Sequence, residues 1–268
     1  MAIRSAHATT IPPVTPGDNR LGVDVMVRSL PLIRGIRAAR LFTNPKDEGD
    51  SYTSVRLQPH DDRMIITAAN PLAMLITSAA LVEGAWSDAG VIDLTVDQVA
   101  QIVSIYGANP DGESQMRITA TESKVRTVDA SGLIDGLNHN WDRRAMAETA
   151  PDVPQVVAEV WPAVVREKGK IPPISQSVTA AAEKAAAIFN KADLYFAATE
   201  THHLISLGVS ARIISVIPDE FRPGAKIPDA AVETLGSSLE PGESMTIETG
   251  ASAGANVVTF TAPKNGVF

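Results

Sequence analysis

The pattern in this chain that most directly suggests chemistry is Gly250-Ala-Ser-Ala-Gly254, which matches the G-x-S-x-G signature. In α/β-hydrolases this signature places a nucleophilic serine, here Ser252, on a sharp turn between a strand and a helix, and an acid and a histidine follow later in the chain. Residues 255–268 contain no Asp, Glu or His, and the match lies between two strand patterns. We therefore interpret the segment as a hairpin turn of small residues.

The histidines do not form a recognisable catalytic or metal-binding set. His202 and His203 are adjacent in a strand pattern, so their side chains point to opposite faces and cannot readily share a metal. His60-Asp61-Asp62 could bind a cation, but this sequence at a hairpin tip is typical of a polar turn. The chain also lacks the nucleotide-binding and zinc-protease signatures. The sequence predicts no enzyme activity, metal or cofactor, and a hydrolase built around Ser252 or His60 stays as a third alternative.

Composition and charge limit the remaining classes of protein. The 268 residues are 44% hydrophobic and 20% charged, which is typical of a globular protein with a proper core. The chain has no cysteine, no apolar run of signal-peptide length and no membrane-spanning stretch, so we expect a cytoplasmic protein, or one in the host cytoplasm if it is viral. A net charge of −8 disfavours nucleic-acid binding unless the positive side chains are gathered on one face.

An internal repeat positions most of the remaining features. When the sequence is shifted by 129 residues, Ala197-Ala198 falls on Ala68-Ala69, and Leu204-Ile205-Ser206 falls on Leu75-Ile76-Thr77. Both copies read as two apolar strands joined by a short polar turn, which is a hairpin pattern. Weaker copies follow at residues 116–128 and 245–261. Four hairpins, each preceded by a helix-like segment, indicate a chain built by repeated duplication.

The first half of the chain carries two predicted helices. One begins at Ser29, which we expect to cap it, and has Arg34, Arg37 and Arg40 along one side. Its apolar stripe consists of Leu32, Ile33, Ile36 and Ala39. Residues 95–98 form a capping box that begins a second helix at 96–106, after a short strand at 91–94. Gly107 follows this helix, where a left-handed cap is expected.

A proline-rich connection at residues 131–176 separates the two halves, and residues 156–160 within it are predicted to form a strand. The second half begins with an alanine-rich helix over 178–191, capped by Ser177, in which Lys184 and Lys191 share a face. A strand at 211–217 and a short helix at 230–239 precede the last hairpin. We therefore divide the chain into an N-terminal arm at 1–20 and two domains at 21–150 and 151–268. The order of elements predicts an α+β fold, with antiparallel sheets covered on one face by helices.

Over residues 27–264 this order of elements resembles a DNA sliding clamp, the ring-shaped processivity factor of replication. Pro151-Asp-Val-Pro154 is similar to the segment that begins the second domain of bacterial clamps, and residues 194–219 also resemble a clamp. Phe260-Thr-Ala-Pro-Lys264 is similar to the end of the proliferating-cell clamp of eukaryotes and archaea. The bacterial clamp has three domains and this chain has two, so a six-domain ring would need three copies. The mixture of features resembles a phage-type or divergent bacterial-like clamp.

The resemblance implies a non-catalytic protein in which two duplicated domains place their sheets outside and their helices toward duplex DNA. By resemblance, the cations on those helices meet phosphates without reading bases; they are Arg34, Arg37, Arg40, Lys184 and Lys191. It also implies an apolar pocket for the binding peptide of a DNA polymerase, formed by Leu133, Ile134, Phe260, Ala262 and Pro263. Solvated helix faces, and core positions for Leu133 and Ile134, stay open as simpler interpretations. The main alternative function is a structural assembly protein of a viral particle.

Overall fold

The computed structural model describes residues 22–46, 52–87, 90–107, 113–130, 137–143, 150–161, 173–217, 244–249 and 256–261. Its first half repeats one unit, a strand, a helix and three further strands. The first copy is β1 (Val23–Arg28), α1 (Ser29–Arg40), β2 (Ser54–His60), β3 (Arg63–Ala69) and β4 (Ala73–Trp86). The second is β5 (Ile92–Thr95), α2 (Val96–Tyr106), β6 (Gln115–Ala120), β7 (Lys124–Asp129) and β8 (Asn138–Asp142).

The second half of the described chain begins with two helices and continues as strands. Its elements are α3 (Val153–Val160), α4 (Gln176–Ile188), β9 (Leu194–Ala198), β10 (His202–Leu207), β11 (Ala211–Val216), β12 (Ser244–Thr249) and β13 (Asn256–Thr261). The hairpin of β12 and β13 confirms the predicted last hairpin. Gly250–Gly254, with Ser252, and the helix predicted at 230–239 lie outside the described residues.

The 129-residue repeat holds for one hairpin and does not extend to the helices, because the same shift places α4 on residues 47–59, which include most of β2. In the hairpin of β3 and β4, Ala68 lies opposite Leu75. In the hairpin of β9 and β10, Ala197 lies opposite Leu204, at the same offset. The pairs on either side keep this offset along the whole of β9. The sequence match therefore reflects two hairpins of the same register, at different places in the order of elements: β3 is the second strand after α1, and β9 is the first strand after α4.

Every strand pairing within the described part of the chain is antiparallel, which confirms the predicted α+β class with antiparallel sheets. Strands follow the order β5-β2-β3-β4-β1-β6-β7-β8, and β11, β10 and β9 extend the sheet from β4. β4 is long enough to pair with β3 and β11 near its start and with β1 near its end. The two halves of the chain are thus joined by a continuous ladder between β4 and β11.

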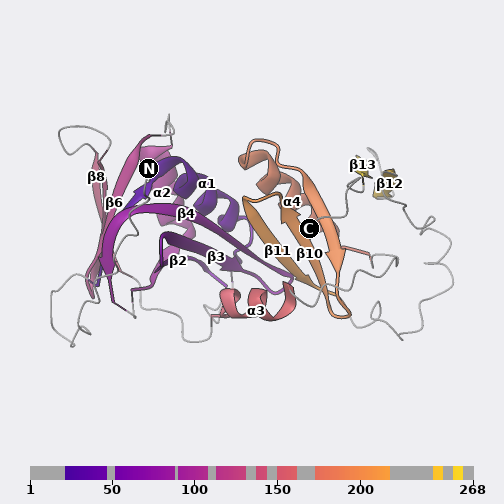
Figure 1. Ribbon diagram of the computed structural model, residues 1–268, viewed down its shortest axis with the longest axis horizontal. Helices are drawn as coiled ribbons and strands as arrows, with labels where there is room; N and C mark the ends of the chain where they lie inside the picture. Colours follow the sequence, from indigo (N-terminus) through magenta and orange to yellow (C-terminus); the bar gives the residue numbers. More distant parts are fainter. Residues whose placement is uncertain are drawn as a thin grey trace, which may run out of the picture.

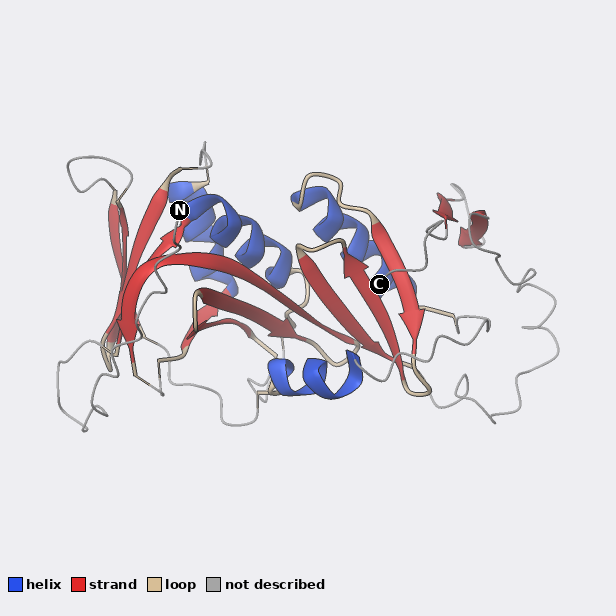
Figure 2. Cartoon of the chain, viewed as in Figure 1, coloured by secondary structure: helices blue, strands red, loops and turns tan. Residues whose placement is uncertain are grey.

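Helices α1, α2 and α4 lie on one face of this curved sheet, and α3 lies on the other (Figures 1 and 2). α1 lies between the other two helices of its face and contacts both. It approaches the sheet closely because Gly35 has no side chain: a Cβ atom there would lie 2.4 Å from Ile66 Cδ1 and 3.2 Å from Thr77 Cγ2. The main core lies between these helices and the sheet and includes residues of both halves.

The segment 156–160, predicted as a strand, is instead the main part of helix α3. The Asp152 side chain accepts a hydrogen bond from the backbone N–H of Gln155, and Pro154 lies in the first turn, where a missing N–H costs nothing. Val153 and Val157, four residues apart, are buried against the sheet. Burial of this helical stripe outweighs the preference of valine for strands.

The other helix boundaries differ from the predictions in smaller ways. The capping box of Thr95 and Gln98 is confirmed, but Gly107 after α2 has φ −86° rather than a left-handed conformation. α1 begins at Ser29 itself, with Arg28 as the residue before it and no side-chain cap. α4 covers 176–188 instead of 178–191, and it begins after Ser175. The described part of the chain contains no helix long and apolar enough to cross a membrane.

Candidate nucleic-acid interface

The three arginines of α1 lie on its solvent side. Arg34 is half-buried, and Arg37 and Arg40 are exposed. Their positions are fixed because Ile33 and Ile36 of the same helix are buried in the main core. The helix contains no acidic residue. Arg37 and Arg40 also lie in its last turn, where a positive charge stabilises a helix even without a ligand.

The second predicted group of cations is divided between α4 and the turn after it. Lys184 is exposed on the helix. Lys191 is also exposed, but it lies beyond the helix end, so the prediction that the two lysines share a helix face is wrong. Asn190 and Lys191 have φ values of 61° and 58°, which end the helix in a left-handed turn. Asn is one of the few residues that adopts this conformation at low cost.

An open cleft of about 360 Å³ separates α1 from the end of α4. Arg34, Arg37 and Asn190 supply its polar lining, and Leu30, Ile33 and Ile188 are among its apolar lining residues. The guanidinium Nη2 of Arg34 donates a hydrogen bond of 2.8 Å to Asn190 Oδ1. This contact joins residues 156 positions apart, so sequence analysis did not identify Asn190. Its only signal is an Asn just after a helical pattern.

Within the described residues, the five predicted cations form no ion pair, whereas five other basic residues do. None of Arg34, Arg37, Arg40, Lys184 and Lys191 forms an ion pair with another described residue. Elsewhere Arg28, Arg56, Arg63, Arg117 and Lys124 each pair with a carboxylate. Three of these cations lie on α1 and two lie on or just after α4, although Lys46, Arg126, Arg143 and Arg212 also form no ion pair with a described residue.

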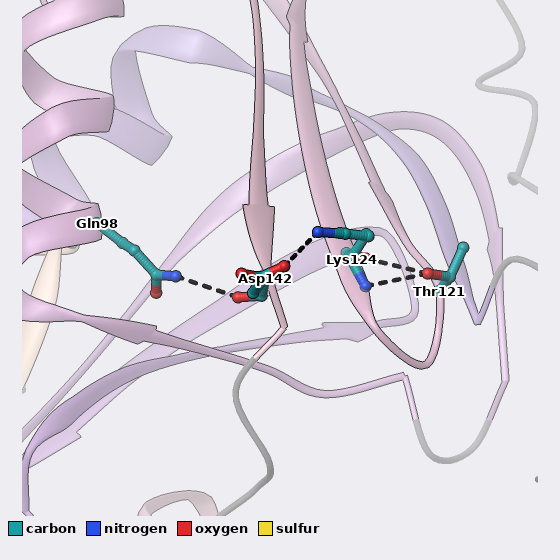
Figure 3. Close-up of polar contacts among 4 residues, drawn as sticks. All are labelled: Gln98, Thr121, Lys124 and Asp142. Atoms are coloured by element: carbon teal, nitrogen blue, oxygen red, sulfur yellow. Dashed lines mark hydrogen bonds and ion pairs between the residues drawn. The ribbon is translucent and has the colours of Figure 1, made fainter.

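The contacts around Lys124 illustrate the contrasting, neutralised arrangement (Figure 3). Its ammonium group forms an ion pair with Asp142 at the end of β8, and its backbone N–H donates to the hydroxyl of Thr121. The side chain of Gln98 in α2 donates to the backbone carbonyl of Asp142. α2 itself carries Asp97 and no basic residue. These contacts secure the edge of the sheet and neutralise the charge of Lys124.

The remaining predicted sites are largely outside the described residues. Leu133, Ile134, Ala262 and Pro263 are not described, and Phe260 is placed only as a residue of β13, opposite Met245. Where the structure describes the chain, no three His, Asp or Glu side chains come together in a way that could hold a metal ion. His60 Nε2 lies 3.5 Å from Asp61 Oδ2 at the exposed hairpin tip between β2 and β3.

Comparison with solved structures identifies the architecture. The chain is similar to the sliding clamp (DNA polymerase III subunit beta) of Pseudomonas aeruginosa bound to griselimycin, with 11% sequence identity and a TM-score of 0.52. The match covers 84% of this chain and 70% of the Pseudomonas chain. The fold is that of a sliding clamp. A DNA polymerase III beta subunit from Thermotoga maritima gives the same result at 12% identity, with a TM-score of 0.50 and coverage of 77% of this chain and 68% of that chain.

The similarity to clamps is one of backbone and not of sequence. No family model and no curated protein sequence matches the chain. The clamp fold explains why one strand-helix-strand unit recurs, and why α1, α2 and α4 share a face of the sheet. It does not by itself assign a role to any side chain.

Proposed function

We propose that this protein is a DNA sliding clamp, a ring that encircles duplex DNA and tethers a replicative DNA polymerase. The observation that carries the proposal is the clamp fold with uncompensated cations on the helical face, in a chain whose net charge is −8. In a ring, that face lines the hole. Arg34, Arg37, Arg40, Lys184 and Lys191 then attract phosphates without reading bases, so the ring moves along DNA.

The protein has no catalytic role in this proposal. Topological linkage keeps the tethered polymerase near its template. The polymerase therefore rebinds the template from the ring instead of searching for it through solution. The polymerase peptide binds an apolar pocket that includes Leu133, Ile134, Phe260, Ala262 and Pro263. Three copies of a two-domain chain supply the six domains of the ring. A phage-type or divergent bacterial origin accounts for the low sequence identity.

Oligomeric mass and DNA topology test this proposal together. Light scattering should give the mass of a trimer, whereas larger closed shells would favour a structural component of a viral particle. Rings are then assembled by concentrating dilute subunits with nicked circular DNA, and the complex is separated from free protein by gel filtration. We expect protein to stay with the circle and to be released when a restriction enzyme linearises it. Equal retention on circular and linear DNA would contradict encirclement.

The charged face is tested in the same assay. Changing Arg34, Arg37 and Arg40 together to Glu should weaken binding to DNA at low salt. The protein should stay folded by circular dichroism, with a moderately lower melting temperature because negative charge is unfavourable in the last turn of α1. Ser252→Ala should not alter stimulation of the polymerase, because the serine has no nucleophilic role in a clamp. Unchanged DNA binding by the triple variant would place the contact surface elsewhere on the molecule.

A further inference from the structure

The cleft between α1 and α4 has a more specific form than a generally positive surface. It lies where the first helix of one half meets the helix of the other half, and α1 contacts α4 directly. Two guanidinium groups, those of Arg34 and Arg37, line it together with the amide of Asn190. No acidic residue is among its lining residues. An anion that entered the cleft would therefore be attracted by two cations and would not be repelled by an acidic lining residue.

The two arginines are held differently. Arg34 is half-buried and is oriented by the hydrogen bond to Asn190 Oδ1. Asn190 is itself fixed by the left-handed turn that ends α4. Arg37 is exposed and forms no ion pair with any described residue. A guanidinium has several N–H donors in a fixed plane, so Arg34 keeps donors for a ligand while one of them binds Asn190.

The shape and polarity of the cleft favour a sugar–phosphate unit. Apolar residues, including Ile33 and Ile188, line the cleft together with the charged ones. A phosphodiester offers anionic oxygens for two guanidinium groups, and the adjoining deoxyribose offers a largely apolar surface. α2 carries no basic residue, so the other side of α1 gives a DNA strand no comparable contact.

We propose that the α1–α4 cleft seats the sugar–phosphate backbone of duplex DNA, with Arg37 contacting phosphate and Asn190 acting as a positioning residue for Arg34. This inference rests on the proposed clamp function. It adds that the DNA backbone passes over the junction between the halves, in a cleft that Gly107 at the end of α2 also lines. Arg40 contributes general attraction from outside the cleft.

Binding to a short fluorescent duplex, measured by anisotropy from low to moderate salt, tests the cleft. Arg37→Gln should weaken binding about fivefold at low salt and reduce the slope of log K against log salt by about 1, as expected for one lost phosphate contact. Asn190→Gly keeps the left-handed turn but removes the acceptor. It should weaken binding about threefold, because Arg34 is no longer oriented. Asn190→Asp keeps an acceptor but neutralises Arg34, so the salt slope should fall as with Arg37→Gln.

Arg126→Gln is the matched control, since it removes one exposed positive charge from β7. Its neighbours Val125 and Thr127 are buried, so Arg126 points to the face of the sheet opposite the helices. It should bind like the wild type. If the wild type is retained on circular DNA but the cleft variants bind like Arg126→Gln, the cleft proposal is wrong and the clamp function stands. If the wild type itself is not retained on circles, the clamp function fails first.

Discussion

Arginine has two separate uses in this chain, and the partners of each side chain distinguish them. Arg56 of β2 donates hydrogen bonds of 2.8 and 2.9 Å to the two carboxylate oxygens of Asp93 in β5, whose side chain is buried. The hydrogen bond to Asp93 raises the pKa of Arg56 further above its usual value. This pair joins the two repeated units of the first half, because β2 and β5 belong to different units. Arg34, Arg37 and Arg40 of α1 have no carboxylate partner among the residues that the structure places.

Asp93→Ala should therefore destabilise the protein strongly. It leaves Arg56 partly buried beside an empty, apolar position, and breaking a pair of this kind typically costs about 3 kcal/mol. The free energy of unfolding, measured in urea, checks this value. The double variant Arg56→Met with Asp93→Leu should recover most of the loss, because it removes both charges. If the double variant is as unstable as Asp93→Ala, the hydrogen bonds of the pair contribute to stability beyond neutralising each other's charge.

At the residue scale the sequence predicted what depends on local pattern. Arg34, Arg37 and Arg40 were placed correctly on the outer side of a helix because the apolar stripe of that helix fixes the direction of the others. Lys191 was misplaced because the helix ends early, and helix ends depend on a few local conformations. Asn190 was missed altogether. Its partner, Arg34, is distant in the sequence, and no local pattern reports such a contact.

At the scale of elements, the packing of α1 on the sheet is set by one small residue. Gly35 faces Ile66 and Thr77, and the space between helix and strands is too small for a methyl group without movement. The elements themselves were largely predictable, since hairpins and amphipathic helices have clear periods. α3 was not, because its valines favour a strand locally, and the Asp152 cap and burial against the two halves of the sheet together make it a helix.

Gly35→Ala tests this packing. Alanine favours a helix by about 1 kcal/mol over glycine, but overpacking against Ile66 should cost about 2 kcal/mol, so we expect a net loss of stability of about 1 kcal/mol. Ile66→Val removes the Cδ1 atom that the new methyl group would meet. In a double-mutant cycle by urea unfolding, Gly35→Ala should become stabilising in the Ile66→Val background. Additive effects would contradict the proposed contact.

At the scale of the whole molecule, the two halves behave as one packed body in the described structure. β11 pairs with β4, and Ile213 of β11 lies opposite Leu75 of β4, with both side chains buried in the same core. On the other face α3 covers the seam, where Val157 packs in a cluster with Ile214, and the guanidinium of Arg212 lies 4.7 Å from the centroid of the Trp161 ring. The domain boundary proposed at residue 150 is thus crossed by both a strand ladder and an apolar core.

Ile213→Ala should consequently weaken both halves. Removing a fully buried isoleucine side chain typically costs about 3 kcal/mol. Hydrogen exchange should show faster opening of amides in α1 and β3 as well as in β10. Val216→Ala, on the same strand at a position with 43% exposure, is the control and should change little. Loss of protection confined to the second half would indicate that the halves unfold separately.

The shared ladder between β4 and β11 also has a mechanical consequence for a closed ring of such chains. A sheet that runs unbroken through the middle of each subunit makes that subunit a stiff arc. Strain applied to the ring would then concentrate where separate chains meet. If the proposed ring forms, it would open at a contact between neighbouring copies, and each copy would move as one rigid unit.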